Sequence, residues 1–313
     1  MDGWPHERTG EAAVAMPAPP TAATDAFWRS ARFCRALVRF PATRQVGKRW
    51  LSALARQCLA PHLTLESQLA DKHVVLDLKQ PADRDIYLYG RGDPRGVGAI
   101  ERVMRRLGCR TALDVGANRG NHAAFMRRHS HRLFAFEPHP FEYQRLATLF
   151  AGDGQVTALK LGLSDTDGEL PFRLDEANSG ISTFEIGDGV ANAVSSVRTG
   201  DAFAADHALR DIDFIKIDVE GHEAKVLRGL SGVIRDQRPV IIMEILEAQS
   251  RADAGFEALL PGYCFFGNRT GFWSGLTLSA YSFCTFRYGK TYMSALMVPA
   301  EKLRLLRGLG LHD

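Results

Sequence analysis

The predicted fold is decided by one stretch, Thr111-Ala-Leu-Asp-Val-Gly-Ala-Asn-Arg-Gly-Asn121. It begins as a short apolar strand, breaks at Gly116 and continues toward a helix. A strand, a glycine-rich turn and a helix form a cradle for a nucleotide-like ligand, because glycine lets the ligand approach the backbone and the helix N-terminus offers free N–H groups. Asp114, Gly116, Asn118 and Gly120 lie at alternate positions across this break.

Length and composition describe an ordinary globular protein. The chain has 313 residues, of which 45% are hydrophobic and 24% charged, enough for one large α/β domain with extensions or for two small domains. The net charge of +3 is too small to indicate nucleic-acid binding by the whole molecule. The five cysteines are scattered without a Cys-x-x-Cys pair, so we expect reduced thiols and neither a zinc knuckle nor a disulfide framework.

No targeting segment is evident. The chain has no apolar run near the roughly 20 residues that span a bilayer, and its first residues lack the basic-then-apolar pattern of a signal peptide. We therefore expect a cytoplasmic location.

The first 65 residues differ from the rest. Residues 1–24 are rich in Ala, Pro and Thr without periodicity, which predicts a disordered tail. Residues 25–65 predict a basic helical arm, with Arg29, Arg32, Arg35 and Arg39 in one arc of an amphipathic helix. Residues 26–60 could contact an anionic membrane surface or a polyanion; alternatively, the arm packs on the folded domain with its arginines in water.

From residue 66 the pattern is that of a folded domain. Residues 66–108 predict two strands, His73–Lys79 and Asp85–Tyr89, joined by a turn, and then a helix over Gly96–Leu107. Residues 109–305 form the predicted core, and 306–313 a tail. Predicted core strands are Thr111–Val115, Leu133–Phe136, Val156–Leu161, Phe214–Ile217 and Val240–Met243; predicted helices are Asn121–Arg128, Pro140–Phe150, His222–Leu230 and, less clearly, Ala248–Leu259.

Apolar strands that alternate with amphipathic helices predict a doubly wound α/β fold, a mostly parallel sheet covered on both faces. Tyr263–Phe266 and Met293–Val298 follow as two strands without a clear intervening helix, so we expect an antiparallel closing pair. The stretch Gly267–Tyr288 should be irregular.

Carboxylates follow nearly every predicted core strand. Glu137 comes 23 residues after Asp114, the spacing at which an acidic side chain meets the ribose hydroxyls in dinucleotide-type folds. Asp165, Asp218 and Glu244 follow later strands. Because ligands of open α/β sheets bind beyond the carboxyl ends of the strands, we expect these side chains to gather at one site.

Four motifs in this order resemble the FkbM-type S-adenosylmethionine-dependent methyltransferases. They are Asp114-Val-Gly-Ala-Asn-Arg-Gly-Asn-His122, Phe136-Glu-Pro138, Leu163-Ser-Asp165 and Lys216-Ile-Asp-Val-Glu-Gly-His-Glu223, with a weaker match at Ser294-Ala-Leu-Met-Val-Pro299. The resemblance covers about residues 72–305 and leaves the basic arm outside. It implies a Rossmann-like class I methyltransferase with a seven-stranded sheet whose last strand is antiparallel.

The resemblance also implies roles for the motif residues. Asp114, Gly116, Asn118 and Gly120 would line the methionine and ribose part of S-adenosylmethionine, and Glu137 would accept both ribose hydroxyls. Asp165 would accept a hydrogen bond from the adenine amino group, with Leu163 beside the ring, and Asp218 and Glu220 would lie near the sulfonium and the acceptor. Arg119 stands where the family more often has an aliphatic residue.

Methyl transfer to a hydroxyl benefits from a base that removes the proton. His222 is the candidate for this base, with Asp218 to orient it or to act instead; His122 and His139 are further candidates at the edge of the cleft. Asp218, Glu244 and His222 could converge on a divalent cation, but no spacing requires a metal and we expect none. Neither His-Glu-x-x-His nor a P-loop motif occurs.

The sequence therefore predicts an O-methyltransferase that uses S-adenosylmethionine on a small molecule or glycan. The alternatives are a nucleic-acid methyltransferase guided by the basic arm, an NAD(P)-dependent oxidoreductase, against which Asn118 in the glycine loop argues, and a non-catalytic cofactor-binding protein. Substrate contacts should come from Asn178–Thr183 and Gly267–Tyr288, whose sequences do not identify the acceptor.

Overall fold

The computed structural model describes residues 64–78, 80–175, 182–186, 189–244, 255–268, 283–285, 294–309 and 311–312. The tail and the basic arm that the sequence predicts before residue 64 lie outside the described residues. So does most of the stretch Gly267–Tyr288. Within the described part of the chain, no helix combines the length and the apolar character that crossing a membrane requires.

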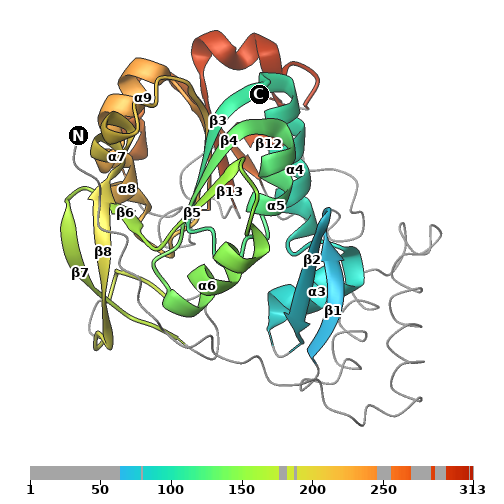
Figure 1. Ribbon diagram of the computed structural model, residues 1–313. Helices are drawn as coiled ribbons and strands as arrows, with labels where there is room; N and C mark the ends of the chain where they lie inside the picture. Colours follow the sequence, from blue (N-terminus) through green and yellow to red (C-terminus); the bar gives the residue numbers. More distant parts are fainter. Residues whose placement is uncertain are drawn as a thin grey trace.

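A mixed sheet forms the centre of the molecule (Figure 1). Its seven principal strands lie in the order β5-β4-β3-β9-β10-β13-β11. Six run parallel, and β13, the last of the seven along the chain, runs antiparallel to both of its neighbours, as predicted. The strands are β3 (Cys109–Val115), β4 (Ser130–Phe136), β5 (Val156–Leu159), β9 (Ile212–Ile217), β10 (Val240–Glu244), β11 (Tyr263–Asn268) and β13 (Ser294–Pro299).

Two short strands that the sequence did not indicate extend this sheet beyond β11. They are β12 (Phe283–Thr285), paired with β11, and β14 (Leu311–His312), paired with β12. The Tyr263–Phe266 and Met293–Val298 strands pair antiparallel, which confirms the predicted closing pair.

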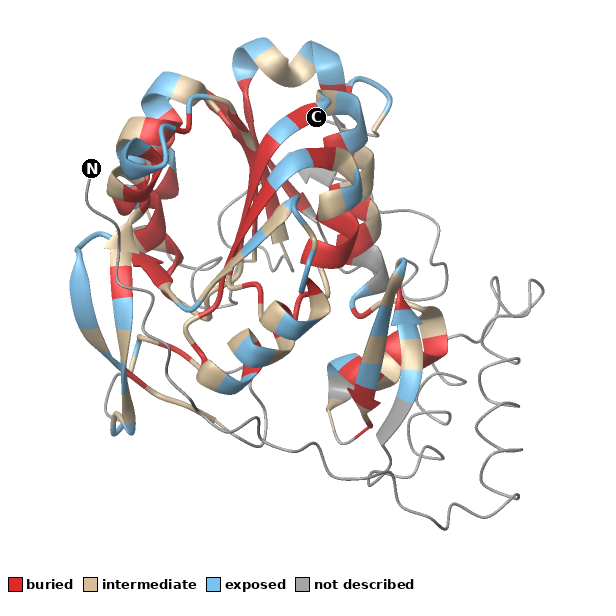
Figure 2. Ribbon diagram, viewed as in Figure 1, coloured by how far each residue is buried: buried red, intermediate tan, exposed pale blue. Residues whose placement is uncertain are grey.

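Helices cover both faces of the sheet, and each face has its own apolar core (Figures 1 and 2). One core includes Ile100, Ala112 and Phe125, and the other includes Leu113, Ile215 and Leu227. Neighbouring residues 112 and 113 enter opposite cores because side chains alternate along a strand, which explains why the central strands are apolar throughout. The first face carries α4 (Pro94–Leu107), α5 (Ala123–Met126) and a 3₁₀ turn at Arg127–His129; the other carries α7 (Gly200–Asp206), α8 (Glu223–Gly229), α9 (Ser231–Gln237) and α11 (Phe256–Leu259).

A small module precedes the core, and one of its predicted strands is wrong. The predicted strand at 73–79 is β2 (Lys72–Asp77), but its partner is the preceding strand β1 (Thr64–Leu69). The segment Asp85–Tyr89 belongs to a helix, α3 (Pro81–Tyr89). Pro81 occupies the first helical turn, where its missing N–H costs nothing, and so begins this helix instead of forming a hairpin turn.

A second, three-stranded sheet lies beside the core. It consists of β6 (Gly162–Ser164), β8 (Ala193–Thr199) and β7 (Gly168–Phe172), in that order. Helix α6 (Pro140–Leu149) follows β4, and a 3₁₀ helix over Ala300–Leu306 follows β13. Helices α7 and α9, of seven residues each, were not predicted.

Candidate functional site

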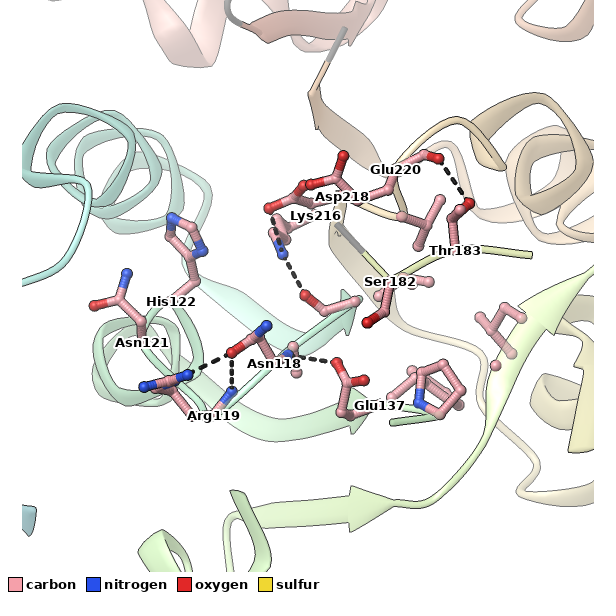
Figure 3. Close-up of a pocket in the computed structure, with 18 of the residues that line it drawn as sticks. Asn118, Arg119, Asn121, His122, Glu137, Ser182, Thr183, Lys216, Asp218 and Glu220 are labelled. Carbon is pink, nitrogen blue, oxygen red and sulfur yellow. Dashed lines mark hydrogen bonds and ion pairs between the residues drawn. The ribbon is translucent and has the colours of Figure 1, made fainter. Parts of the chain in front are cut away.

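A cavity of about 360 Å³ opens where β3, β4 and β9 end (Figure 3). Its wall includes Gly116, Asn118, Glu137, Leu163 and Asp218, which the sequence had assigned to the site. The carboxyl ends of parallel strands meet at this edge of the sheet, as expected for a ligand site in an open α/β fold. The size lies within the usual range for small-molecule pockets, about 300–1,000 Å³.

The turn after β3 requires its glycine. Gly116 has a φ of 77°, and a Cβ at this position would lie 1.8 Å from the Asp218 carbonyl oxygen. The turn is fixed to β4 because the Gly116 and Ala117 N–H groups both donate to the Phe136 carbonyl, at 3.0 and 2.9 Å. Asn118 also has a positive φ, 50°, a conformation that Asn tolerates better than most residues.

Gly120 does not line the cavity. Its φ is 93°, and a Cβ there would approach Leu149 and Leu146 of α6 within 2.8 and 3.0 Å. Its role in this structure is the close packing of the turn against α6, so we correct its assignment from ligand contact to packing.

Glu137 is held by backbone N–H groups at the end of β4. Asn118 N donates to Oε2 at 2.7 Å and His139 N donates to Oε1 at 2.8 Å. Burial raises the pKa of Glu137 to about 7, although both backbone hydrogen bonds work against this rise. Each carboxylate oxygen keeps a further lone pair, so the group can accept two hydroxyls of a ligand.

Lys216, in the cavity wall, lies between two carboxylates. Its Nζ is 3.2 Å from both Asp114 Oδ1 and Asp218 Oδ2, and it donates to the Gly116 carbonyl at 2.7 Å. Burial alone would lower the pKa of Lys216, but the two carboxylates outweigh burial and raise it. Asp114 is fully buried and is absent from the cavity wall, so it acts on the site through Lys216. The sequence argument missed this lysine, although a charge within the apolar strand β9 was a signal for it.

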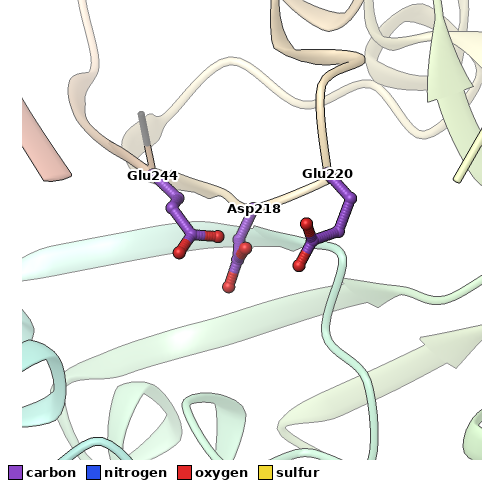
Figure 4. A group of neighbouring side chains, drawn as sticks. All are labelled: Asp218, Glu220 and Glu244. Carbon is purple, nitrogen blue, oxygen red and sulfur yellow. The ribbon is translucent and has the colours of Figure 1, made fainter. Parts of the chain in front are cut away.

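Three carboxylates meet at one side of the cavity (Figure 4). One carboxylate oxygen from each of Asp218, Glu220 and Glu244 lies within 4.8 Å of the other two. The hydrogen bond to Asp218, together with burial, raises the pKa of Glu244 to about 10, and burial beside Asp218 raises that of Glu220 to about 7. His222 is not part of this group, which corrects the metal-ligand set considered from the sequence; the expectation of no metal stays a prediction.

His222 lies outside the cavity, which corrects its assignment as the base. The residue is 1% exposed, and both ring nitrogens already have partners. Nδ1 is 2.6 Å from Glu185 Oε1 and Nε2 is 2.9 Å from Ser164 Oγ. Burial lowers the pKa of His222 in spite of Glu185. The ring therefore fixes Glu185 and the strand β6 to the start of α8, and no acceptor can reach it.

Asp165 pairs with Arg228 and does not face the cavity, where the adenine amino group was predicted to meet it. Its Oδ2 accepts from Arg228 Nε of α8 at 3.0 Å, and the residue is absent from the cavity wall, whereas Leu163 is part of it. The attraction of the Arg228 guanidinium explains why the carboxylate does not face the predicted adenine position. His139, a further candidate, is buried outside the cavity.

Glu223 is an acidic residue in the first turn of α8, one of the interpretations open from the sequence. Its Oε1 accepts from the N–H groups of Val219 and Gly221, at 3.3 and 3.1 Å. It supports the loop that carries Asp218 and Glu220 and does not line the cavity.

The remaining wall comes from segments at some distance in the chain. Ser182 and Thr183 line it, as predicted for the Asn178–Thr183 segment, and Thr183 Oγ1 donates to the Glu220 carbonyl at 2.8 Å. Gln80, Ala82 and Asp93 of the N-terminal module line it as well, and the sequence had no signal for them.

Arg119 connects this module to the turn. Its guanidinium lies 2.7 Å from Asp83 Oδ1 and 3.1 Å from Glu142 Oε1, and its N–H donates to Asn118 Oδ1 at 2.8 Å. The arginine that departs from the family pattern is therefore paired on both sides, and it fixes α3 and α6 to the turn after β3.

Comparison with known proteins matches part of the chain to a methyltransferase family. The family model described as the methyltransferase FkbM domain matches residues 114–267. A hexuronic acid methyltransferase, AglP, from Haloferax volcanii is 29% identical over 41% of this chain and 53% of its own. A methyltransferase, sdnD, from Sordaria araneosa is 29% identical over 38% of this chain and 59% of its own. The chain thus spans little more than half the length of these curated relatives.

Two solved structures match the chain at low identity and low TM-score. Methyltransferase FkbM from Methylobacillus flagellatus has a TM-score of 0.40 and 14% identity, over 87% of this chain and 59% of that one. An O-methyltransferase from Bacillus cereus in complex with SAH has a TM-score of 0.39 and 13% identity, over 66% of this chain and 81% of that one. The fold assignment rests on the strand order given above.

Proposed function

We propose that this chain, a methyltransferase of the FkbM family, transfers a methyl group from S-adenosylmethionine to a hydroxyl of a small molecule or sugar. The observation that carries the proposal is Glu137, a buried carboxylate that lines the cavity with each oxygen held by one backbone N–H. Such a carboxylate suits the two hydroxyls of a ribose, because charge-assisted hydrogen bonds are about twice as strong as neutral ones.

The other residues of the cavity fit the same ligand. The Gly116 turn lets a ligand approach the backbone, and Leu163 offers an apolar contact for the adenine ring. Asp218 lies across the cavity from Glu137 in Figure 3, and its negative charge suits the positive sulfonium. S-adenosylmethionine would supply an activated methyl carbon there, and the protein would align the acceptor oxygen with it, an effect that can contribute about 7–11 kcal/mol.

The name of the Haloferax volcanii relative suggests sugars as the first acceptors to test. The experiment measures binding of S-adenosylmethionine and of NAD by titration calorimetry, and then transfer of a tritium-labelled methyl group to a panel of neutral sugars and hexuronic acids. We expect binding of S-adenosylmethionine alone and labelling of at least one panel member.

Glu137→Gln should weaken S-adenosylmethionine binding at least tenfold, about 1.4 kcal/mol, while the exposed Glu169→Gln on β7 should not change it. Binding of NAD instead would favour an oxidoreductase and contradict the proposal. Binding without transfer to any class of acceptor would favour a non-catalytic cofactor-binding protein.

A further inference from the structure

His122 and Asp93 form a histidine–carboxylate pair on the cavity wall. His122 Nε2 lies 3.7 Å from Asp93 Oδ2, and both residues line the cavity. Figure 3 shows His122 on the same side as Asn121, across the cavity from Ser182 and Thr183. Among the described histidines that the sequence had proposed as bases, His122 lies in the cavity wall and His139 and His222 do not.

The segment that carries Asp93 is fixed to the segment that carries His122. Gly92 N donates to Asn121 Oδ1 at 2.8 Å, and Asn121 Nδ2 donates to the Gly92 carbonyl at 3.0 Å. These two reciprocal hydrogen bonds join Gly92, which precedes Asp93, to Asn121, which precedes His122. Asp93 has a φ of 36°, a left-handed conformation that is rare outside glycine and that tends to persist at functional sites.

Gly96 makes room for the Asp93 carboxylate. A Cβ at Gly96, in the first turn of α4, would lie 1.8 Å from Asp93 Oδ2. Gly98, two residues later in the same helix, has nothing within 4 Å of its Cβ position. The absence of a side chain at position 96 thus allows the carboxylate to lie where it meets His122.

We propose that His122 is the general base of the methyl transfer and that Asp93 orients its ring. The inference rests on the proposed function. With Nε2 3.7 Å from the Asp93 carboxylate, an ion-pair distance, the carboxylate favours the tautomer that keeps the proton on Nε2 and leaves the Nδ1 lone pair for the acceptor. Asp93 is a positioning residue, since it acts through His122.

The reaction balances with these groups. The acceptor oxygen forms a bond to the methyl carbon while its proton passes to His122 Nδ1, and the carbon–sulfur bond breaks with its electron pair left on sulfur. The products are a methyl ether, a neutral thioether and an imidazolium, which later returns its proton to water. Asp93 lies 3.7 Å from His122 Nε2 and Asp218 lines the same cavity, so the new positive charge forms in a site that carries carboxylates.

The first test needs no acceptor. Nitrogen-15 NMR of the imidazole rings reports the tautomer, and the His122 signal among the ten histidines is assigned by its loss in His122→Gln. We expect the Nε2–H tautomer in the wild type and in Gly98→Ala, and a mixture in Gly96→Ala and Asp93→Asn. A His122 tautomer that is the same in all four proteins would overturn the proposal.

The second test measures the rate of methyl transfer to the panel sugar that the wild type labels fastest. His122→Gln should lower the rate about 10²–10⁴-fold, the loss expected when a general base is removed, with the affinity for S-adenosylmethionine within threefold of wild type. It should also remove the dependence of the rate on pH that a general base produces. Gly96→Ala should lose at least tenfold in rate, and Gly98→Ala should match the wild type.

Glu220 offers the competing base, so Glu220→Gln is compared at the same time. A pH–rate profile that changes in Glu220→Gln but not in His122→Gln would assign the base to Glu220 and overturn the proposal. A wild type that does not bind S-adenosylmethionine would defeat the proposed function instead, and the NMR comparison would still decide whether Asp93 orients the ring.

Discussion

At the scale of single residues, Glu137 shows how a strand end becomes a ligand group. Its place 23 residues after Asp114 is visible in the sequence. Its chemistry depends on the two backbone N–H groups that hold it and on the burial that raises its pKa to about 7. Neither of these can be derived from residue order alone.

The raised pKa of Glu137 predicts how stability changes with pH. The native state binds this proton more tightly than the unfolded chain, whose carboxyl titrates near its ordinary value, so the free energy of unfolding should fall as pH rises from about 4.5 to about 7. The loss is at most about 3 kcal/mol, from about 1.36 kcal/mol per pKa unit. Denaturant unfolding at several pH values should show this fall in the wild type and a flatter profile in Glu137→Gln.

The raised pKa of Glu137 also predicts how cofactor binding changes with pH. Ribose hydroxyls donate to the ionised form, so the affinity for S-adenosylmethionine should rise about tenfold between pH 6 and pH 8. Titration calorimetry at the two pH values checks this prediction. An equal rise in Glu137→Gln would show that a different group is responsible.

Removal of Lys216 should destabilise the protein strongly. Lys216→Met leaves Asp114 buried without its countercharge, a change that typically costs about 3–5 kcal/mol. The double variant Lys216→Met with Asp114→Asn should recover part of this loss in denaturant unfolding. The exposed Lys160→Met serves as the control and should stay within about 0.5 kcal/mol of wild type. A single variant as stable as this control would contradict the prediction.

At the scale of secondary-structure elements, α3 matters for the site because Arg119 fixes it there. Asp83 of α3 bonds to the Arg119 guanidinium and also accepts from the Asp77 N–H at 2.8 Å. The same helix follows Gln80 and contains Ala82, both in the cavity wall. The N-terminal module and the turn after β3 are therefore joined through the buried guanidinium of Arg119.

Asp83→Ala should destabilise the protein by about 3–5 kcal/mol, since Arg119 loses one of its two buried carboxylates. It should also weaken binding of S-adenosylmethionine, because Asn118 and the wall formed by α3 lose their support. Unfolding and calorimetry measure the two effects. Asp71→Ala breaks an exposed pair with Arg127 and should cost less than about 1 kcal/mol. Similar losses in the two variants would contradict this role of Asp83.

At the scale of the whole molecule, the candidate site extends beyond the residues that the family model matches. The match begins at residue 114, whereas the cavity wall includes Gln80 and Asp93, and the turn after β3 is paired to Asp83. The N-terminal module and the core should therefore respond to the ligand as one unit.

S-adenosylmethionine at about 100 times its dissociation constant should raise the free energy of unfolding by about 2.7 kcal/mol. Hydrogen exchange should then show added protection in α3 and α4 as well as in the turn after β3. Protection confined to residues 109–244 would show that the module does not take part in binding.

The sequence by itself determined the doubly wound sheet, its antiparallel last strand and the place of Glu137 and Asp218 at the strand ends. These follow from local pattern, because continuous apolar strands demand cover on both faces and their carboxyl ends meet at one edge.

Only the tertiary structure decided which polar groups face the cavity. Asp165 pairs with Arg228. His222 is enclosed between Glu185 and Ser164. The segment Asp85–Tyr89 is part of a helix that begins at a proline. Each outcome depends on a partner that is distant in the chain or on packing against another element. The direction of a side chain at the end of a strand is set by such partners, and a linear pattern does not contain them.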